Sequence, residues 1–407
     1  MENPVLEYIK LLDRRPDVIA KILLEHVKTY KLSDEEQLGI VELWLKNPQL
    51  AESLFSAYCE QNSLGEATLL RLLELWKNGS DSAGCFLQKY GAKWSLGTKV
   101  ETELVKSDFF EVESFLLSYS KKHIFCEDAQ VALVELIPNS LAIVLLKAQR
   151  SYAKSTLLKM LDIWTQYPEV VSGIIFSDKC LESIFEKKDV LLKVLDFIEE
   201  KPDEVSKIVL AYQQYNGREY PIFIEIMEKL LNYIEKGSES AKKLFASCSE
   251  CLSFYGDICE KIMVIFKEKP ADMYSIVSSV VKKDHDDCMD TELIKLWQGG
   301  SKEAYNLLMV SYCIDPGDTA KVFALWQQGV PGAYEILKAQ DINLLLGNNV
   351  QIKLVDLLGK GSEEAYNLLF AHTHYPGHKL CPEALMKLAL IETPEADTII
   401  KRTINEH

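Results

Sequence analysis

The segment from His372 to Cys381 contains the residues of this chain best suited to metal chemistry. It holds three histidines and one cysteine, namely His372, His374, His378 and Cys381. Three imidazoles and a thiolate can complete the tetrahedral ligand shell of a zinc ion. Their spacing matches no well-defined zinc module, and surface loops also collect histidine without binding a metal. We predict a plain loop with no bound metal, and a metal-binding or enzymatic centre at this segment stays open as the alternative.

A second candidate for chemistry is the CxxC motif from Cys248 to Cys251. A redox-active CxxC is expected after a strand and at the start of a helix, whereas the surrounding sequence has a helical pattern throughout. The chain contains no phosphate-binding loop and no GxGxxG, GxSxG or HExxH motif. We therefore predict no catalytic residues, no cofactor and no enzymatic activity.

The helices that position these residues are predicted by one short sequence pattern, which occurs about thirteen times along the chain. Its clearest copies are Leu43-Trp44, Leu75-Trp76 and Leu296-Trp297. With the Trp position as an anchor, successive copies lie 29 to 36 residues apart, and the residue ten positions after each anchor is always apolar. The anchors are Leu12, Trp44, Trp76, Val105, Val134, Trp164, Ile198, Ile234, Phe266, Trp297, Trp326, Leu358 and Leu390. A recurring period of this size is the signature of repeat architectures.

Each copy predicts two helices joined by a tight turn. The apolar residues at the anchor, and one and three positions before it, lie on one helical stripe. Four positions after the anchor, Pro or Ser occurs in eleven of the thirteen copies, and these residues suit the first turn and the N-cap of a helix. Gly precedes that Ser at positions 79, 237, 300 and 361, where it permits a left-handed end of the preceding helix.

These pairs predict an all-α fold, a right-handed α-solenoid of about thirteen stacked helix-turn-helix repeats. A single pair cannot bury its apolar stripe alone, but stacked pairs form one continuous core. The unbroken period predicts a single continuous domain over residues 1–407, with capping units at 1–30 and 380–407. We expect the anchor tryptophans to fill space between consecutive pairs.

The composition limits the partners of the chain. The formal net charge is −16, which repels phosphate backbones and anionic membrane surfaces. No stretch of about 18 apolar residues exists, so we predict no membrane insertion, and no secretory signal peptide is seen. We interpret the ten cysteines as free thiols in a reducing compartment, which predicts a cytoplasmic location.

Three resemblances follow from these patterns. In its repeat length and its predicted helix pairs, the whole chain resembles α-solenoids of the HEAT, armadillo and tetratricopeptide class. The turn from Gln298 to Ala304 resembles the inter-helix turn of transcription-activator-like effectors, which implies that Gln298-Gly299, Gln327-Gln328 and Gly359-Lys360 would face DNA bases. The irregular repeats without a catalytic domain also resemble scaffold effectors of intracellular bacteria such as Legionella, which implies action in the host cytoplasm.

The function we predict is a non-catalytic scaffold or adaptor that binds a partner protein or peptide on its concave face. The binding residues should be those that the repeat does not require, with aromatic or Arg side chains as anchors. The candidates are Tyr212, Tyr215, Arg218, Tyr305, Tyr334 and Tyr366. A metal-binding or enzymatic protein centred on His372–Cys381, and a nucleic-acid-binding repeat protein, remain the alternatives.

Overall fold

A computed structural model describes residues 4–107, 111–216, 221–249, 257–282, 287–311, 314–340, 344, 346–374 and 378–405. These residues form α-helices, two short 3-10 helices and no strand, which confirms the all-α prediction. The chain folds into two compact units, Met1–Val194 and Leu195–His407. The prediction of one continuous domain stays a prediction.

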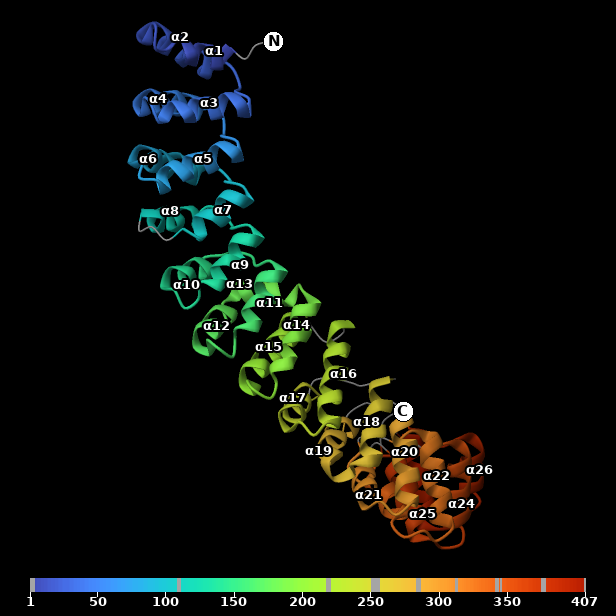
Figure 1. Ribbon diagram of the computed structural model, residues 1–407. Helices are drawn as coiled ribbons and strands as arrows, with labels where there is room; N and C mark the ends of the chain where they lie inside the picture. The colour runs from blue at the N-terminus through green and yellow to red at the C-terminus, as the bar shows by residue number, and fades with distance from the viewer. Residues whose placement is uncertain are drawn as a thin grey trace. The chain divides into compact units, whose positions relative to one another are not determined.

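The first unit contains fourteen α-helices and one 3-10 helix in its described part (Figure 1). They are α1 (Pro4–Leu11), α2 (Pro16–Thr29), α3 (Asp34–Trp44), α4 (Pro48–Tyr58), α5 (Glu66–Lys77), α6 (Asp81–Tyr90), η1 (Gly91–Lys93), α7 (Thr98–Val105), α8 (Glu111–Ser120), α9 (Glu127–Glu135), α10 (Ser140–Lys147), α11 (Lys154–Asp162), α12 (Pro168–Ile175), α13 (Asp178–Phe185) and α14 (Lys188–Val194).

The second unit begins with the other 3-10 helix and continues with thirteen α-helices among its described residues. They are η2 (Leu195–Phe197), α15 (Pro202–Asn216), α16 (Pro221–Glu235), α17 (Glu239–Ser249), α18 (Asp257–Glu268), α19 (Pro270–Val281), α20 (Asp287–Gln298), α21 (Lys302–Leu308), α22 (Pro316–Gln327), α23 (Ala333–Ala339), α24 (Asn348–Leu358), α25 (Glu363–His372), α26 (Pro382–Leu388) and α27 (Pro394–Asn405).

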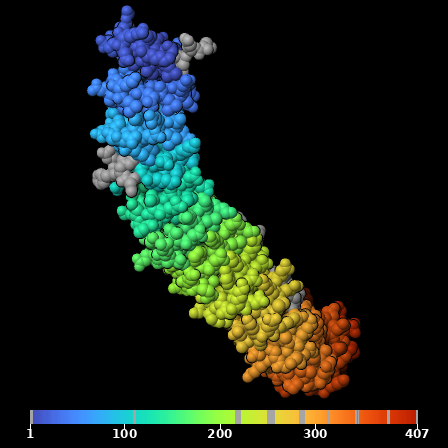
Figure 2. All heavy atoms as spheres, in the orientation of Figure 1, coloured from blue at the N-terminus to red at the C-terminus, as the bar shows by residue number. Residues whose placement is uncertain are grey.

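Within each unit the helices pack as pairs on successive pairs. Helix α3, for example, contacts its partner α4 and the next first helix α5, while α4 contacts α2 and α6. The same pattern joins α16 with α17 and α18, and α17 with α15 and α19. Side chains fill the space between successive pairs of the first unit on the face shown in Figure 2. The core of each unit therefore runs from pair to pair.

The predicted helix starts are largely confirmed. Pro begins a helix at residues 16, 48, 168, 202, 270 and 394. The Ser301 and Ser362 hydroxyls each accept a hydrogen bond from a backbone N–H three residues on, at 3.2 Å. Gly300 and Gly361 before them have φ values of +97° and +86°, the left-handed conformation that only glycine adopts at little cost.

Two local features depart from the predicted pattern. Pro138 does not begin a helix: it follows a cis peptide bond, and helix α10 starts at Ser140, capped by the Asn139 side chain. Helix α13 is an additional element between the α11–α12 pair and α14. The anchor spacing alone could not reveal α13, because the step from Trp164 to Ile198 is within the range of the other steps.

Buried polar side chains link successive pairs, and the repeat pattern did not predict them. Each lies at the fourth residue of a first helix and accepts the backbone N–H of the residue that caps the next first helix. The side chains and their donors are Gln37 with Gly65 (2.8 Å), Glu101 with Cys126 (2.6 Å), Gln130 with Ala153 (3.0 Å) and Gln351 with Cys381 (2.7 Å). We call these four side chains the bridging residues; all are about 3% exposed. They satisfy backbone donors at half-buried helix starts.

Candidate interaction surfaces

The predicted metal segment is built into the contact between the last two helix pairs. His372 ends α25 and is 4% exposed. Its Nδ1 lies 3.0 Å from the carbonyl oxygen of Leu344, and its Nε2 lies 3.2 Å from Nε2 of Gln351. The hydrogen-bond pattern assigns the proton to Nδ1, which donates to Leu344, while Nε2 accepts from the Gln351 amide. Both ring nitrogens of His372 are thus engaged within the protein.

The other residues of this segment are spread over several contacts. The ring of His378 stacks on His372 with centroids 5.3 Å apart, and His374 contacts the guanidinium of Arg402 through Nδ1. Cys381 caps α26, and its backbone N–H is bound by Gln351. Among the described residues, no group of three or more His, Cys, Asp or Glu side chains is arranged to hold a metal ion. The described residues of this segment contact both of the last two helix pairs.

The buried position of His372 predicts a pH-dependent stability. Burial lowers the pKa of His372, and the nearby His378 lowers it further. The unfolded chain binds a proton at this residue near pH ~6.5, whereas the folded chain binds it only at lower pH. The stabilisation is complete above that pH and is lost as the pH falls towards the lowered pKa. We expect the melting temperature to drop on acidification, and the drop to be shallower in His372→Leu; equal slopes in the two proteins would contradict this role.

The cysteines offer no reactive pair in the described part of the chain. Cys248 of the CxxC motif is fully buried, and Cys251 lies outside the described residues. Burial raises the pKa of Cys59 and of Cys180 to about 12. A thiol with such a pKa is a poor nucleophile at neutral pH, because the thiolate is the reactive form.

The tryptophans of the first unit pack between helix pairs, as expected. Trp44, Trp76 and Trp164 are at most 4% exposed. The Trp44 ring lies 5.5 Å from Phe86 of the next pair, and its Nε1 donates to Ser82 at 2.8 Å. These side chains belong to the core.

The tryptophans of the second unit differ, because Trp297 and Trp326 are only half-buried. Eight residues after Trp76 the chain has Gly84, where an added Cβ would meet the indole Nε1 at 2.4 Å. Eight residues after Trp297 and Trp326 it has Tyr305 and Tyr334 instead. A large ring at this position takes the space that the indole occupies over glycine, which accounts for the partial exposure. The expectation that the anchor tryptophans fill space between pairs does not distinguish these two half-buried side chains from the buried ones.

Each Tyr contacts its Trp and also the following pair. The Trp297 and Tyr305 centroids are 6.2 Å apart, and those of Trp326 and Tyr334 are 5.7 Å apart. A Cβ on Gly332 would lie 2.7 Å from the Tyr305 ring, so that ring packs directly on the next inter-helix turn. The Tyr334 hydroxyl in turn accepts a 3.5 Å hydrogen bond from Asn367, on the helix that carries the next tyrosine.

These half-buried rings form a row along the inter-helix turns of the second unit. Tyr366 continues it, and its ring is tilted against that of Phe370 with centroids 5.6 Å apart. Tyr274 occupies the same place after Phe266 and is also half-buried; the sequence interpretation missed it, although its spacing from the anchor was visible. We call the row the aromatic ladder: Tyr274, Trp297, Tyr305, Trp326, Tyr334 and Tyr366. The turn residues Gln298-Gly299, Gln327-Gln328 and Gly359-Lys360 beside it are exposed.

An open pocket lies at the C-terminal end of the ladder. It has a volume of about 440 Å³ and is lined by Leu358, Tyr366, Asn367, Thr393 and other residues of the last two turns. The hydroxyl-bearing and amide side chains around one aromatic ring could receive a side chain of a partner.

The remaining predicted binding residues do not join the ladder. Tyr212 is fully buried in α15, which corrects its assignment to a binding surface: its spacing places it on the core face of the helix. Tyr215 is 59% exposed near the end of the same helix. Arg218 lies outside the described residues.

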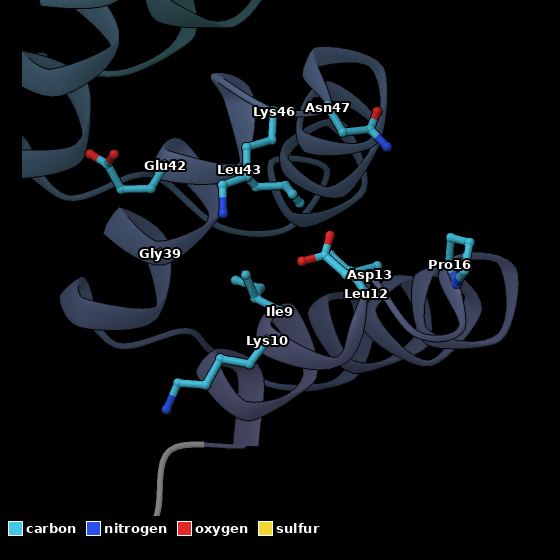
Figure 3. A pocket seen from close by; sticks show the side chains of 10 residues that line it. All are labelled: Ile9, Lys10, Leu12, Asp13, Pro16, Gly39, Glu42, Leu43, Lys46 and Asn47. Carbon is cyan, nitrogen blue, oxygen red and sulfur yellow. The ribbon is translucent and has the colours of Figure 1, made fainter.

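A second pocket lies between α1 and α3 in the first unit, with a volume of about 410 Å³ (Figure 3). Ile9, Leu12 and Leu43 form its apolar part, and charged side chains stand at its rim. Of these, Glu42 is bound by Arg71 at 3.1 Å and Lys10 by Glu7 at 2.7 Å. In Figure 3, Lys10 and Glu42 extend away from Asp13. The pocket therefore brings no pair of carboxylates together for acid–base chemistry.

None of the described helices is both long and apolar enough to cross a membrane.

No protein family model and no curated protein matches the sequence. Among solved structures, the chain is similar to an engineered protein at 13% sequence identity, with 99% of this chain and 98% of that chain covered and a TM-score of 0.20. A similarity at that TM-score carries no argument about fold or function.

Proposed function

We propose that this protein is a non-catalytic scaffold that binds a partner protein or peptide through the aromatic ladder. The observation that supports the proposal most is the half-burial of six aromatic rings at two recurring places of the repeat, the anchor and the position eight residues after it. Rings that are fixed by packing on one side and exposed on the other supply contact area at low entropic cost. Such anchors dominate the energy of protein interfaces.

The proposed architecture is a right-handed α-solenoid of about thirteen pairs. The packing of each helix on its own partner helix and on the next pair supports it. In such an arrangement the inter-helix turns form one continuous edge, and the ladder would follow that edge in the second unit.

Two finer proposals concern where the scaffold acts. Cys59, Cys85, Cys126, Cys180 and Cys381 are free thiols, which supports a reducing compartment such as the cytoplasm. The second proposal is delivery into a host cytoplasm by an intracellular bacterium, and it is based on the irregular repeats without an attached catalytic domain.

Removal of three tyrosine rings tests the ladder. We expect the triple variant Tyr305→Ser, Tyr334→Ser, Tyr366→Ser to lose most of the partner that the wild-type protein retains, because a hot-spot ring contributes about 2 kcal/mol. The measurement is quantitative mass spectrometry of proteins retained by each immobilised protein, after circular dichroism has shown that the variant is folded. Tyr30→Ser is the matched control, since Tyr30 is 59% exposed and lies in the first unit. Equal retention by the triple variant and the control would overturn the proposal.

A further inference from the structure

A second surface, in the first unit, has a charge opposite to that of the whole chain. The sequence contains 61 acidic and 45 basic residues, yet residues 82–100, 114–126 and 136–161 contain no Asp or Glu. Each of these stretches includes the end of a second helix (α6, α8 or α10) and the loop that follows it. Six exposed cations lie at these helix ends and loops: Lys89, Lys93, Lys121, Lys122, Lys147 and Arg150. We call this set the basic edge.

Hydrogen bonds place the three loops side by side. The Arg150 guanidinium donates to the carbonyl oxygen of Lys121 at 3.2 Å. The His123 ring lies 3.2 Å from the carbonyl oxygen of Ala92, next to Lys93. The backbone N–H of Phe125 donates to the Gln149 side chain at 2.9 Å, which joins the second and third loops again. The cations of the basic edge therefore belong to one surface of three layers.

The basic edge has no acidic partners of its own in the described part of the chain. None of its six cations forms a salt bridge there, whereas neighbouring cations on first helices do, such as Lys77 with Glu103 at 3.1 Å and Lys159 with Glu135 at 3.3 Å. Lys89 and Lys93 instead lie 5.0 Å from the centroid of the Tyr90 ring. A cluster of like charges without counter-ions attracts an anionic ligand.

Partly exposed apolar groups accompany these cations. Trp94 is half-buried and stacks on Tyr90 with centroids 6.2 Å apart. Ile124 is 46% exposed, directly after Lys121, Lys122 and His123. Helix C-termini favour cations through the helix dipole, which accounts for Lys89 and Lys147 in last turns. The dipole does not account for the half-buried Trp94 and the exposed Ile124 on the same loops.

We propose that the basic edge binds a short acidic segment of a partner protein, with an apolar residue of that segment against Trp94 or Ile124. The first and third helix layers are two interaxial spacings of 8–10 Å apart, or about 20 Å, which is roughly the length of six residues of extended chain. A nucleic acid or an anionic membrane would extend beyond this span and meet the surface that gives the chain its net charge of −16. Charges screen over about 8–10 Å at physiological salt, so a short peptide can be attracted by the basic edge alone.

The test uses the full chain and a fluorescent octapeptide of glutamates with two leucines, measured by fluorescence anisotropy. We expect saturable binding that weakens with salt and is absent for the matched peptide with glutamine in place of glutamate. The double variant Lys93→Glu, Lys122→Glu should weaken binding by at least about tenfold, or 1.4 kcal/mol. Trp94→Ala should weaken it without changing its salt dependence.

The control carries the same charge change elsewhere: Lys302→Glu, Lys338→Glu, two exposed positions of the second unit. It should leave the affinity for the acidic peptide within about twofold of wild type. Equal weakening by the two double variants, or no binding of the acidic peptide, would overturn the proposal. Tighter binding of a single-stranded oligonucleotide, or retention on vesicles rich in phosphatidylserine, would assign the basic edge to that ligand instead and equally overturn it. None of these outcomes bears on the aromatic ladder, which lies in the other unit.

Discussion

Trp164→Ala should lower the free energy of unfolding of the first unit by about 3–5 kcal/mol, the usual cost of removing a large buried aromatic side chain. The Trp164 side chain is fully buried, and its Nε1 donates to Ser172 at 2.9 Å. The substitution leaves a cavity in the core and a half-buried Ser172 hydroxyl without its donor. Urea unfolding followed by amide hydrogen exchange in α11 and α12 measures the loss.

The matched substitution in the second unit is Trp326→Ala. Trp326 holds the same place in the repeat but is half-buried, so its truncation removes less buried area and should cost only about 1–2 kcal/mol. Exchange of the amides in α22 and α23 provides the comparison. Equal losses for the two substitutions would contradict the claim that Trp164 is more deeply buried than Trp326.

Gln130→Ala is the second change with a large expected effect, about 3 kcal/mol. The Gln130 amide accepts from the Ala153 N–H and donates to the carbonyl oxygens of Phe125 at 2.9 Å and Ser151 at 3.3 Å. Truncation leaves the buried Phe125 carbonyl without its donor and the half-buried Ala153 N–H without its acceptor, and each such group costs about 1–3 kcal/mol. The measurement is the melting temperature together with the exchange rates of amides at the start of α11.

Two further variants separate the hydrogen bonds from the loss of side-chain volume. Gln130→Glu keeps an acceptor for Ala153, as Glu101 does for Cys126 at 2.6 Å, and should cost less than Gln130→Ala. Gln61→Ala changes an exposed glutamine and should stay within about 0.5 kcal/mol of wild type. If Gln130→Ala is as mild as Gln61→Ala, the bridging residues do not hold successive pairs together.

Local chemistry decided which parts of the fold were predictable. Pro16 and Pro48 begin helices because their fixed φ suits the first turn, and Gly300 adopts a left-handed conformation before the cap Ser301. These choices depend on a few neighbouring residues, so the sequence shows them. Pro138 has the same spacing but lies two residues before its helix, because the Asn139 side chain is the N-cap and α10 begins only at Ser140.

The bridging residues and the ladder depend on contacts between pairs, which spacing within one pair does not encode. Gln130 looks like an ordinary polar residue of a helix until the next cap is placed beside it. Tyr212 and Tyr305 are both tyrosines of second helices, yet one is fully buried and the other half-buried. His372 resembled a metal ligand by composition, but its neighbours Leu344 and Gln351 occupy both ring nitrogens. The packing of adjacent pairs explains Gln130, contacts within one pair explain His372, and spacing along the helix already separates the two tyrosines.

The central claim is that the aromatic ladder is the partner-binding surface, and site-specific photo-crosslinking tests it most directly. A photoreactive phenylalanine analogue replaces either of two exposed residues. Gln327 directly follows Trp326 at the end of α22, and Lys338 lies near the C-terminal end of α23, away from the inter-helix turn. After irradiation in the cell that contains the partner, we predict a discrete covalent adduct at position 327 and none at position 338. Adducts of equal yield at both positions, or none at position 327, would contradict the claim.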